Sequence, residues 1–469
     1  MQELRKDTAS PHSSPLSEST LKKDAFGKDF YWGVSIAAAQ NEGAVDQDGK
    51  GLSIWDVFAA RRGKVKGGHQ PVMACDFYHR YREDIYLAKS LGFNAFRFSI
   101  SWPRILPNGT GKVNPEGLRY YHSVIDTCLE AGLTPFVTLY HWDLPHALQE
   151  QGGWVSILAD TWFAAYVRVC ATAFGDKVKN WIVLNEPISF TALGYMLGIH
   201  APGKKGITNF LPAVHNAALA QAIGGRIVRA EVSGANIGTS FSFSEVLPFS
   251  EAGEDIEAAA KVDIMMNRLF IEPVLTGHYP TKENFPLLDK IYFRNKAWRY
   301  TDQLKFNFDF IGVQNYFPVV IKHNPVVPYI NATEVKAPER KVPHTDMGWE
   351  INAESFYRTI KRIVSYEGVK SVLVTENGAA YSDIVRNGIV HDHQRREYFE
   401  QHIQALLRAR NEGLPIKGYF AWTLTDNFEW SEGYHPRFGL VHVNHTTQER
   451  TVKMSGKWWQ NFLNAHPLH

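Results

Sequence analysis

Cysteine is scarce in this chain, and its scarcity argues against a fold held together by disulfide bonds. Only three cysteines, Cys75, Cys128 and Cys170, occur among 469 residues. They are too few and too scattered to form a disulfide framework. We interpret them as small buried apolar residues in a reducing compartment.

The chain also lacks an excess of charge of either sign and any long apolar run. The 50 basic and 48 acidic residues leave a formal charge of +2, which gives no electrostatic footprint for nucleic acid. The sequence holds no stretch of about 18 apolar residues that could span a membrane. It also holds no basic amphipathic stretch that would favour a membrane surface. We therefore expect neither nucleic acid nor a membrane as a partner, while the oligomeric state is left open.

The N-terminal segment is poor in apolar residues. Residues 1–24 are rich in Ser, Thr, Pro and charge, a composition typical of disorder. They contain no apolar central run of the kind that a secretory signal needs. We predict a mobile tail over residues 1–24, a catalytic domain over residues 25–469, and a cytoplasmic location.

Aromatic residues, in contrast, are abundant. The chain has 13 Trp, 20 Tyr and 28 Phe, and hydrophobic residues make up 44% of it. Aromatic faces stack on sugar rings, but they also fill large cores. Composition alone favours the core.

Short runs rich in β-branched and aromatic residues recur along the sequence. Most of them are continuously apolar, which is typical of strands that are covered on both faces. The eight runs are residues 30–40, 94–102, 134–142, 179–187, 235–243, 309–317, 371–378 and 416–424. Helical periods lie between them, at residues 81–91, 116–131, 163–174, 212–232, 254–275, 355–365 and 392–411. Eight strands that alternate with helices predict an α/β fold, a single (β/α)₈ TIM barrel.

Two long irregular stretches interrupt this pattern, at residues 281–305 and 324–347. Loops of such length are commonly functional. We predict that both lie over the open end of the barrel, at the C-terminal face of the strands.

Polar residues gather where several of the predicted strands end. The run NWIVL leads into Asn185-Glu186-Pro187, and SVLV leads into Thr375-Glu376-Asn377-Gly378. Other strand ends reach His141-Trp142-Asp143, Gln314-Asn315-Tyr316, and Trp422 followed by Glu429-Trp430. The C-terminal ends of barrel strands are where such enzymes place catalysis.

Two of these strand ends place a carboxylate beside an Asn. Glycoside hydrolysis needs two carboxylates, one to protonate the departing oxygen and one to attack the sugar or to activate water. An adjacent amide can hydrogen-bond a sugar hydroxyl. The alternative is that Glu186 and Glu376 are ordinary salt-bridged residues, but their matching contexts on two strands favour a catalytic pair.

Arg97 lies inside the apolar strand Phe96-Arg97-Phe98. A guanidinium that is buried near the barrel axis needs an anion. Glu376 is the natural partner, and the pairing would keep that carboxylate ionised. The alternative is a structural ion pair with another carboxylate.

Six segments together carry a resemblance to a known family. They are FYWGVSIAAAQNEG, FRFSISWPRI, YHWDLP, LNEP, TENG and WTLTDNFEW. With them, the chain from about residue 26 to 459 resembles glycoside hydrolase family 1. The resemblance implies that Glu186 of the NEP segment is the general acid/base and that Glu376 of the TENG segment is the nucleophile.

The resemblance also implies a subsite for the non-reducing sugar, the glycone. Five residues match positions that hydrogen-bond this sugar: Gln40, His141, Asn185, Glu429 and Trp430. Trp422 matches its stacking platform, and Tyr316 aligns with the tyrosine that hydrogen-bonds the nucleophile. Without the resemblance, Trp422 and His141 would be interpreted as core residues.

The chain departs from the family pattern at three places. Val183 stands where a Thr is usual. Gln314-Asn315-Tyr316 stands where Asn-Tyr-Tyr is usual, so the alignment of Tyr316 could be shifted by one position. Ile188 replaces a Trp that shapes the aglycone side, which weakens any prediction of the leaving group.

These observations predict a retaining β-glycosidase that hydrolyses terminal β-D-glucosyl residues of a small carbohydrate, such as a cello-oligosaccharide or an aryl β-glucoside. β-Galactosides and β-fucosides stay open as further substrates. No metal or organic cofactor is implied, and we interpret His391-Asp392-His393 as a solvated surface segment rather than a metal site. A 6-phospho-β-glycosidase is the first alternative, since Arg437 lies close to Glu429 in sequence. A non-catalytic sugar-binding relative and a glucosyl-transferring enzyme are the others.

Overall fold

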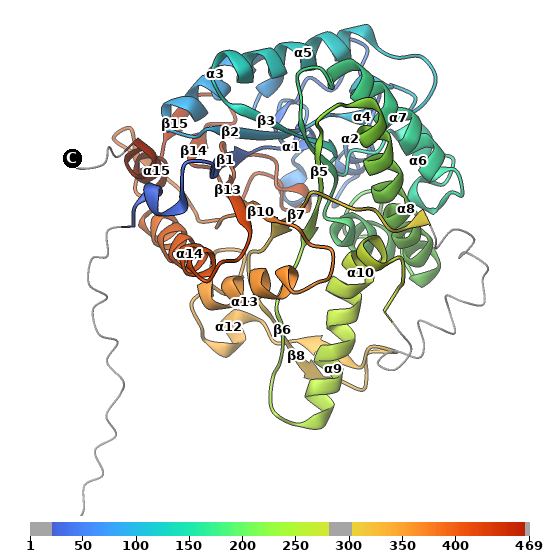
Figure 1. The fold of residues 1–469 in the computed structure, drawn as a ribbon, viewed down its shortest axis with the longest axis vertical. Coiled ribbons are helices and arrows are strands. Elements are labelled where there is room, and N and C mark those ends of the chain that lie inside the picture. The colour runs from blue at the N-terminus through green and yellow to red at the C-terminus, as the bar shows by residue number, and fades with distance from the viewer. Residues whose placement is uncertain (1–20, 281–302, 465–469) are drawn as a thin grey trace, which may run out of the picture.

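The chain folds around a closed barrel of eight parallel strands (Figure 1). The structure is a computed structural model, and it describes residues 21–280 and 303–464. The barrel strands, in spatial order, are β1 (Tyr31–Ser35), β2 (Ala95–Ser99), β3 (Thr134–Tyr140), β4 (Asn180–Asn185), β5 (Asn236–Ser242), β7 (Phe310–Gln314), β10 (Val372–Asn377) and β13 (Ile416–Trp422). β13 pairs with β1 and closes the ring. The predicted (β/α)₈ fold and all eight predicted strands are therefore confirmed.

The first predicted strand, over residues 30–40, was too long. β1 ends at Ser35, and a helical turn, α1 (Ala38–Asn41), follows it. The backbone N–H of Ala38 donates to the Ser99 hydroxyl at 2.8 Å, and Asn41 accepts from the N–H of Ala37 at 3.3 Å. These side-chain acceptors turn the chain out of the sheet, so that Gln40 is presented from a helix at the rim.

Bulky apolar side chains fill the inside of the barrel. Three aromatic rings, Phe136, Phe310 and Phe420, pack together with Ala95, Ile182 and Leu373. Phe136 lies with its ring centroid 4.9 Å from that of Phe420. Gly33 makes room for this packing, because a Cβ there would lie 2.1 Å from the Phe420 ring. This layer makes the barrel interior a packed core rather than a channel.

Helices surround the strands (Figure 1). They include α3 (Phe77–Ser90), α5 (Pro115–Glu130), α7 (Ala159–Phe174), α8 (Ile207–Glu231), α13 (Ala353–Val364), α14 (His393–Asn411) and α15 (Met454–Asn464). α5 has a regular start, because the Asn114 side chain accepts from the N–H of Glu116 and Pro115 occupies the first turn. The helix predicted over residues 254–275 is divided into α9 (Gly253–Asp263), the π-helical turn η5 (Ile264–Arg268) and α10 (Leu269–Thr276).

A small sheet of three strands lies outside the barrel. β6 (Val246–Pro248), β8 (Val319–His323) and β9 (Ala332–Glu334) form it, and it packs on α9. The prediction of an irregular loop over residues 324–347 was wrong, because this stretch holds β9 and α12 (Ala337–Arg340). Pairing of β9 with β8, together with burial of Ala332 against α9, orders it. The loop predicted over residues 281–305 lies outside the described residues as far as residue 302.

The remaining elements are short. They are η1 (Lys23–Phe26), α2 (Ile54–Ala59), η2 (Lys66–Gly68), α4 (Trp102–Ile105), α6 (His146–Gln149), η3 (Gly153–Val155), the π-helix η4 (Ser189–Met196), β11 (Val385–Arg386), β12 (Ile389–Val390), η8 (Trp430–Glu432), β14 (Val441–Val443) and β15 (Arg450–Val452).

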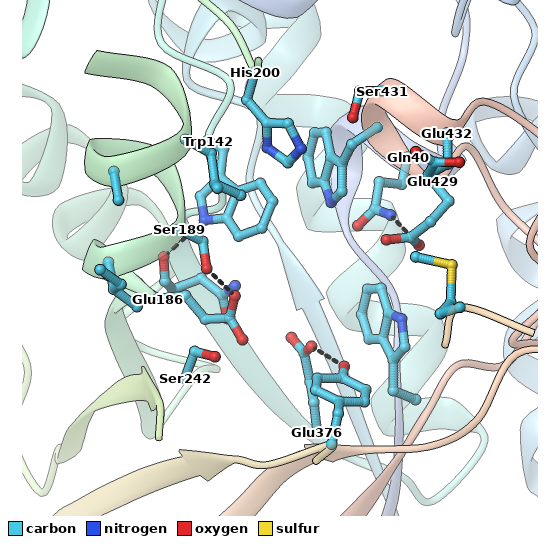
Figure 2. A pocket seen from close by; sticks show the side chains of 18 of the residues that line it. Gln40, Trp142, Glu186, Ser189, His200, Ser242, Glu376, Glu429, Ser431 and Glu432 are labelled. Atoms are coloured by element: carbon cyan, nitrogen blue, oxygen red, sulfur yellow. Dashed lines mark hydrogen bonds between the residues drawn. The ribbon is translucent and has the colours of Figure 1, made fainter. Parts of the chain in front are cut away.

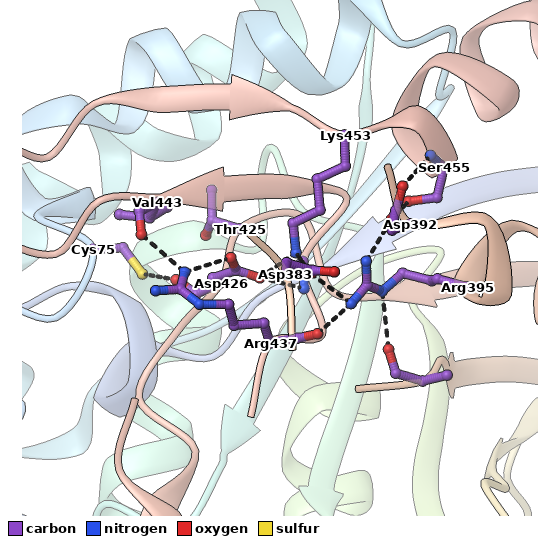
Figure 3. Close-up of polar contacts among 12 residues, drawn as sticks. Cys75, Asp383, Asp392, Arg395, Thr425, Asp426, Arg437, Val443, Lys453 and Ser455 are labelled. Atoms are coloured by element: carbon purple, nitrogen blue, oxygen red, sulfur yellow. Dashed lines mark hydrogen bonds and ion pairs between the residues drawn. The ribbon is translucent and has the colours of Figure 1, made fainter. Parts of the chain in front are cut away.

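A buried network of charges joins α14 to the segment that follows β13 (Figure 3). Arg395 is fully buried and pairs with Asp383 at 2.7 Å and with Asp392. Lys453 is equally buried and pairs with Asp383 at 2.5 Å and with Asp426 at 2.6 Å. The surface interpretation of residues 391–393 is therefore wrong for Asp392, whose carboxylate also accepts from Ser455. Arg395 one turn later on α14 draws it inward, while His391 and His393 are exposed.

The N-terminal tail predicted over residues 1–24 lies outside the described residues as far as residue 20. Within the described part of the chain, no helix is both long and apolar enough to cross a membrane. The cytoplasmic location stays a prediction.

Candidate active site

A cavity of about 410 Å³ opens at the C-terminal ends of the barrel strands (Figure 2). Its size lies within the range of small-molecule sites. Every substrate-binding and catalytic residue predicted from the sequence lines it: Gln40, His141, Asn185, Glu186, Glu376, Trp422, Glu429 and Trp430, together with Tyr316. The tertiary structure thus brings together residues that are spread over almost the whole chain. Asp143, two residues after His141, points elsewhere and lines a much smaller cavity.

Glu376 is held on both of its oxygens. It is the fifth residue of β10, and its side chain is 5% exposed. The Arg97 guanidinium donates to Oε1 at 2.6 Å, which is the ion pair predicted from the sequence. The Tyr316 hydroxyl donates to Oε2 at 2.7 Å, as the alignment without a shift requires. These donors fix the carboxylate in one orientation toward the cavity.

Gln314 is a third donor to Glu376, and no role was predicted for it from the sequence. Its side-chain amide donates to Oε1 of Glu376 at 2.8 Å and to Oδ1 of Asn185 at 2.6 Å. It therefore connects the two strand ends that carry the predicted catalytic pair. Its role could have been predicted from its position as the last residue of the apolar strand β7. Polar residues at the ends of the other apolar strands were assigned to the site for that reason.

Glu186 lies across the cavity in a different environment (Figure 2). It follows directly on β4, with a φ of 44° that a non-glycine residue rarely adopts. Its N–H donates to the carbonyl of Ser240 at 2.9 Å, which ties this turn to β5. The Ser189 hydroxyl donates to its Oε2 at 2.7 Å. No role was assigned to Ser189 from the sequence either.

The two carboxyls differ in what opposes the effect of burial. Burial, and then the nearby charge of Glu376, raises the pKa of Glu186 to about 8. Burial also raises the pKa of Glu376, but the Arg97 guanidinium and the Tyr316 hydroxyl oppose that rise. Glu186 is thus suited to hold a proton near neutral pH, and Glu376 to be ionised.

Asn185 and His141 form a second cluster beside the catalytic pair. Asn185 accepts from Arg97 and Gln314, and its amide donates to Nε2 of His141 at 3.1 Å. Burial, and then the charge of Arg97, lowers the pKa of His141 well below its usual value, so the ring is neutral. With Nε2 as an acceptor, the proton is on Nδ1. Nδ1 is buried and has no hydrogen-bond partner among the described residues.

Gln40 and Glu429 form the opposite wall. The Gln40 amide donates to Oε2 of Glu429 at 3.3 Å and to the carbonyl of Phe428 at 3.0 Å. Burial, and then the charges of Glu376 and Glu186, raises the pKa of Glu429 to about 8. The ring of Trp430 packs 4.5 Å from that of Trp142, while Trp422 lies at the end of β13 and lines the cavity.

Four of the described residues that line the cavity carry a carboxyl: Glu186, Glu376, Glu429 and, at the rim, Glu432. None of the described residues that line it is Lys or Arg. Arg437, which the sequence analysis considered as a phosphate ligand, donates instead to Asp426 at 2.8 Å and to the carbonyl of Val443 at 3.1 Å (Figure 3). Its charge is therefore already neutralised. In the described part of the chain, no group of three or more His, Cys, Asp or Glu is arranged to hold a metal ion.

Known proteins resemble this chain over nearly its full length. The profile of glycosyl hydrolase family 1 matches residues 22–467. Beta-glucosidase A of Thermotoga maritima is 44% identical over 445 residues, covering 94% of this chain and 98% of the relative. Beta-glucosidase A of Acetivibrio thermocellus is 40% identical over 450 residues, covering 94% and 99%. A solved structure of the beta-glucosidase from Thermotoga maritima in complex with deoxynojirimycin is 43% identical, covers 93% of this chain and 98% of its own, and superposes with a TM-score of 0.89. The chain belongs to glycosyl hydrolase family 1.

Proposed function

We propose that this chain is a retaining β-glucosidase, with Glu376 as the nucleophile and Glu186 as the general acid/base. The observation that supports these roles is the contrast between two buried carboxyls in one cavity. Arg97, Gln314 and Tyr316 all donate to Glu376, whereas burial and the charge of Glu376 raise the pKa of Glu186 to about 8. Two carboxyls whose environments separate their pKa values divide into a nucleophile and an acid.

The reaction has two steps. In the first, Glu376 attacks the anomeric carbon while Glu186 protonates the glycosidic oxygen, and the leaving group departs with that proton. In the second, Glu186 takes a proton from water, the water oxygen attacks the anomeric carbon, and the bond to Glu376 breaks. Because each step inverts the anomeric centre, the configuration is retained overall.

The substrate is a small carbohydrate with a terminal β-glucosyl group, such as a cello-oligosaccharide or an aryl β-glucoside. Gln40, His141, Asn185, Glu429 and Trp430 hydrogen-bond the glycone, and Trp422 stacks on it. The neutral His141 lines the cavity and fits this role, since a neutral imidazole can donate or accept a hydrogen bond. The absence of Lys and Arg among the described lining residues and the pairing of Arg437 with Asp426 argue against a 6-phosphorylated sugar.

The test is replacement of Glu376 by Ala. We expect Glu376→Ala to lose hydrolysis of nitrophenyl β-glucoside, because no covalent intermediate can form. Added azide is expected to restore part of the turnover and to yield the α-glucosyl azide, since a small anion fits the vacated space and attacks directly. Formation of the β-glucosyl azide would mean that another residue is the nucleophile.

A panel of nitrophenyl glycosides, assayed with the unmodified enzyme, tests the substrate. The β-glucoside is expected to be cleaved with a kcat/KM well above that of the α-glucoside, and the released sugar is expected to appear first as the β-anomer in NMR spectra. Release of the α-anomer would contradict the retaining mechanism.

A further inference from the structure

Ser189 contacts the proposed acid/base, Glu186, through both its side chain and its backbone. It is the first residue of the π-helix η4, three residues after Glu186. Its hydroxyl donates to Oε2 of Glu186 at 2.7 Å, and its backbone N–H donates to the carbonyl of Glu186 at 3.0 Å (Figure 2). The same residue thus holds both the backbone and the carboxyl of the acid/base.

The turn that carries this contact is fixed from both sides. Glu186 has a positive φ and is tied to Ser240 on β5. After Pro187, the Thr191 hydroxyl donates to the carbonyl of that proline at 2.6 Å. Because these bonds hold the first turn of η4 against the end of β4, the Ser189 hydroxyl has a defined place relative to Glu186.

A donor on one carboxyl oxygen makes the two oxygens chemically different. While Ser189 donates to Oε2, that oxygen is the poorer site for the acidic proton, which is favoured on Oε1. The donor also stabilises the ionised carboxylate and so opposes the effect of burial on its pKa. Both effects bear on proton transfer to the leaving group.

We propose that Ser189 is a positioning residue for the acid/base: its hydroxyl holds Oε2 of Glu186, so that Oε1 carries the proton that goes to the glycosidic oxygen. This proposal rests on the proposed function, because it presumes that Glu186 is the acid. It predicts a defect confined to proton transfer, with the nucleophile left intact.

Other groups also act on Glu186, and the test has to separate them from Ser189. Glu376 on β10 raises its pKa, while Arg97 on β2 and Ser242 at the end of β5 lower it. Tyr316 after β7 and Glu429 after β13 are further titratable groups that interact with it. A change at Ser189 leaves all of these side chains in place, so a shift that it causes is assigned to the hydroxyl.

The experiment compares Ser189→Ala, Ser189→Thr and the unmodified enzyme on two substrates. For Ser189→Ala we expect the alkaline limb of kcat/KM against pH to move upward by about one pH unit, because a hydrogen bond to a carboxylate is lost. At its pH optimum, kcat/KM for cellobiose is expected to fall about tenfold, a fraction of what general acid catalysis contributes. The value for dinitrophenyl β-glucoside, whose leaving group needs no proton, is expected to change less than about twofold on the same grounds.

Ser189→Thr keeps the hydroxyl and is expected to restore both the pH limb and the activity on cellobiose. Ser189→Cys, with a weaker donor, is expected to be intermediate and serves as a second variant if the alanine variant folds poorly. Ser123→Ala on α5 is the control, because Ser123 is exposed and its hydroxyl donates to a helix carbonyl far from the cavity. It is expected to leave both substrates unchanged.

Glu186→Gln, measured in parallel, separates the two ways in which the idea can fail. If Glu186→Gln slows cellobiose far more than the dinitrophenyl substrate while Ser189→Ala slows both equally and leaves the alkaline limb in place, only the role of Ser189 is overturned. If Glu186→Gln itself shows no difference between the substrates, the acid/base assignment fails and the role of Ser189 fails with it.

Discussion

Replacing Glu429 by Gln is expected to relax the preference for a β-glucoside over its 6-phosphate. Glu429 follows β13 on the wall where the glycone is proposed to bind, and its side chain accepts a hydrogen bond from Gln40. A carboxylate there accepts hydrogen bonds from two sugar hydroxyls but repels a phosphate. Glu429→Gln keeps the shape of the side chain and removes its charge, so the change isolates the electrostatic part of the selectivity.

The magnitude follows from the charges that line the cavity. Two unit charges about 4 Å apart repel by roughly 4 kcal/mol at an effective dielectric near 20, which corresponds to nearly a thousandfold in kcat/KM. No described lining residue offers a cation to offset this repulsion. Arg437 cannot do so without leaving Asp426, a carboxylate that is 1% exposed at its side chain.

The repulsion between Glu429 and a 6-phosphate is expected to increase with pH. Burial, and then the charges of Glu376 and Glu186, raises the pKa of Glu429 to about 8. The carboxyl is therefore largely protonated below that pH and ionised above it. A 6-phosphate is already anionic over this range, since its second pKa is about 6. Selectivity for the unphosphorylated sugar is thus expected to increase as the pH rises from about 6 to about 9.

The assay is the ratio of kcat/KM for nitrophenyl β-glucoside to that for its 6-phosphate, at both pH values and at constant ionic strength. Loss of activity through Glu186 at alkaline pH affects both substrates and cancels in the ratio. Glu429→Gln is expected to lower the ratio at pH 9 and to weaken its dependence on pH. Glu432→Gln is the matched control, because that side chain is 42% exposed at the rim, beside Lys66. A ratio that favours the phosphate, or an unchanged pH dependence in Glu429→Gln, would refute the reasoning.

Two further predictions concern the acid and the buried charges. Glu186→Gln is expected to slow cellobiose cleavage at least about a hundredfold, because the departing glucose needs a proton. The glycosylation step with dinitrophenyl β-glucoside is expected to slow far less, since that leaving group needs no proton. If stopped-flow measurements of the glycosylation step show equal losses for the two substrates, Glu186 is not the general acid. Arg395→Ala is expected to lower the free energy of unfolding by about 3–5 kcal/mol, because it leaves Asp383 and Asp392 buried without their shared cation. Denaturant titration measures this loss, and a change under about 1 kcal/mol would mean that Asp383 and Asp392 do not depend on Arg395 for their neutralisation.

The barrel could be predicted from the sequence because local patterns determine it. The continuously apolar runs that became β3, β4 and β10 are buried along nearly their whole length, as strands covered on both faces have to be. Their polar endings follow from the same physics, since the C-terminal ends of these strands line the cavity that holds Glu186 and Glu376. Glu186 and Glu376 could therefore be paired from their places at two strand ends.

The sequence predicted the structure less well where an element or side chain is held by residues that are distant in the sequence. β9 and α12 were predicted as irregular, because Ala332 and its neighbours are ordered by β8 and α9 rather than by their own periodicity. Asp392 was predicted to be solvated, since nothing in the local sequence shows that Arg395 and Ser455 enclose it.

The residue types, the strand ends and the (β/α)₈ fold were thus determined by the sequence alone. Only the tertiary structure decided which donors reach which carboxyl. Gln314 contacts both Glu376 and Asn185, and Ser189 contacts Glu186, through distances that depend on how β4, β7 and β10 lie side by side. Arg437 is near Glu429 in sequence yet is bound to Asp426. A hydrogen bond acts over about 3 Å. Proximity on that scale is a property of the folded chain, because the side chains of residues that are close in sequence can point in opposite directions.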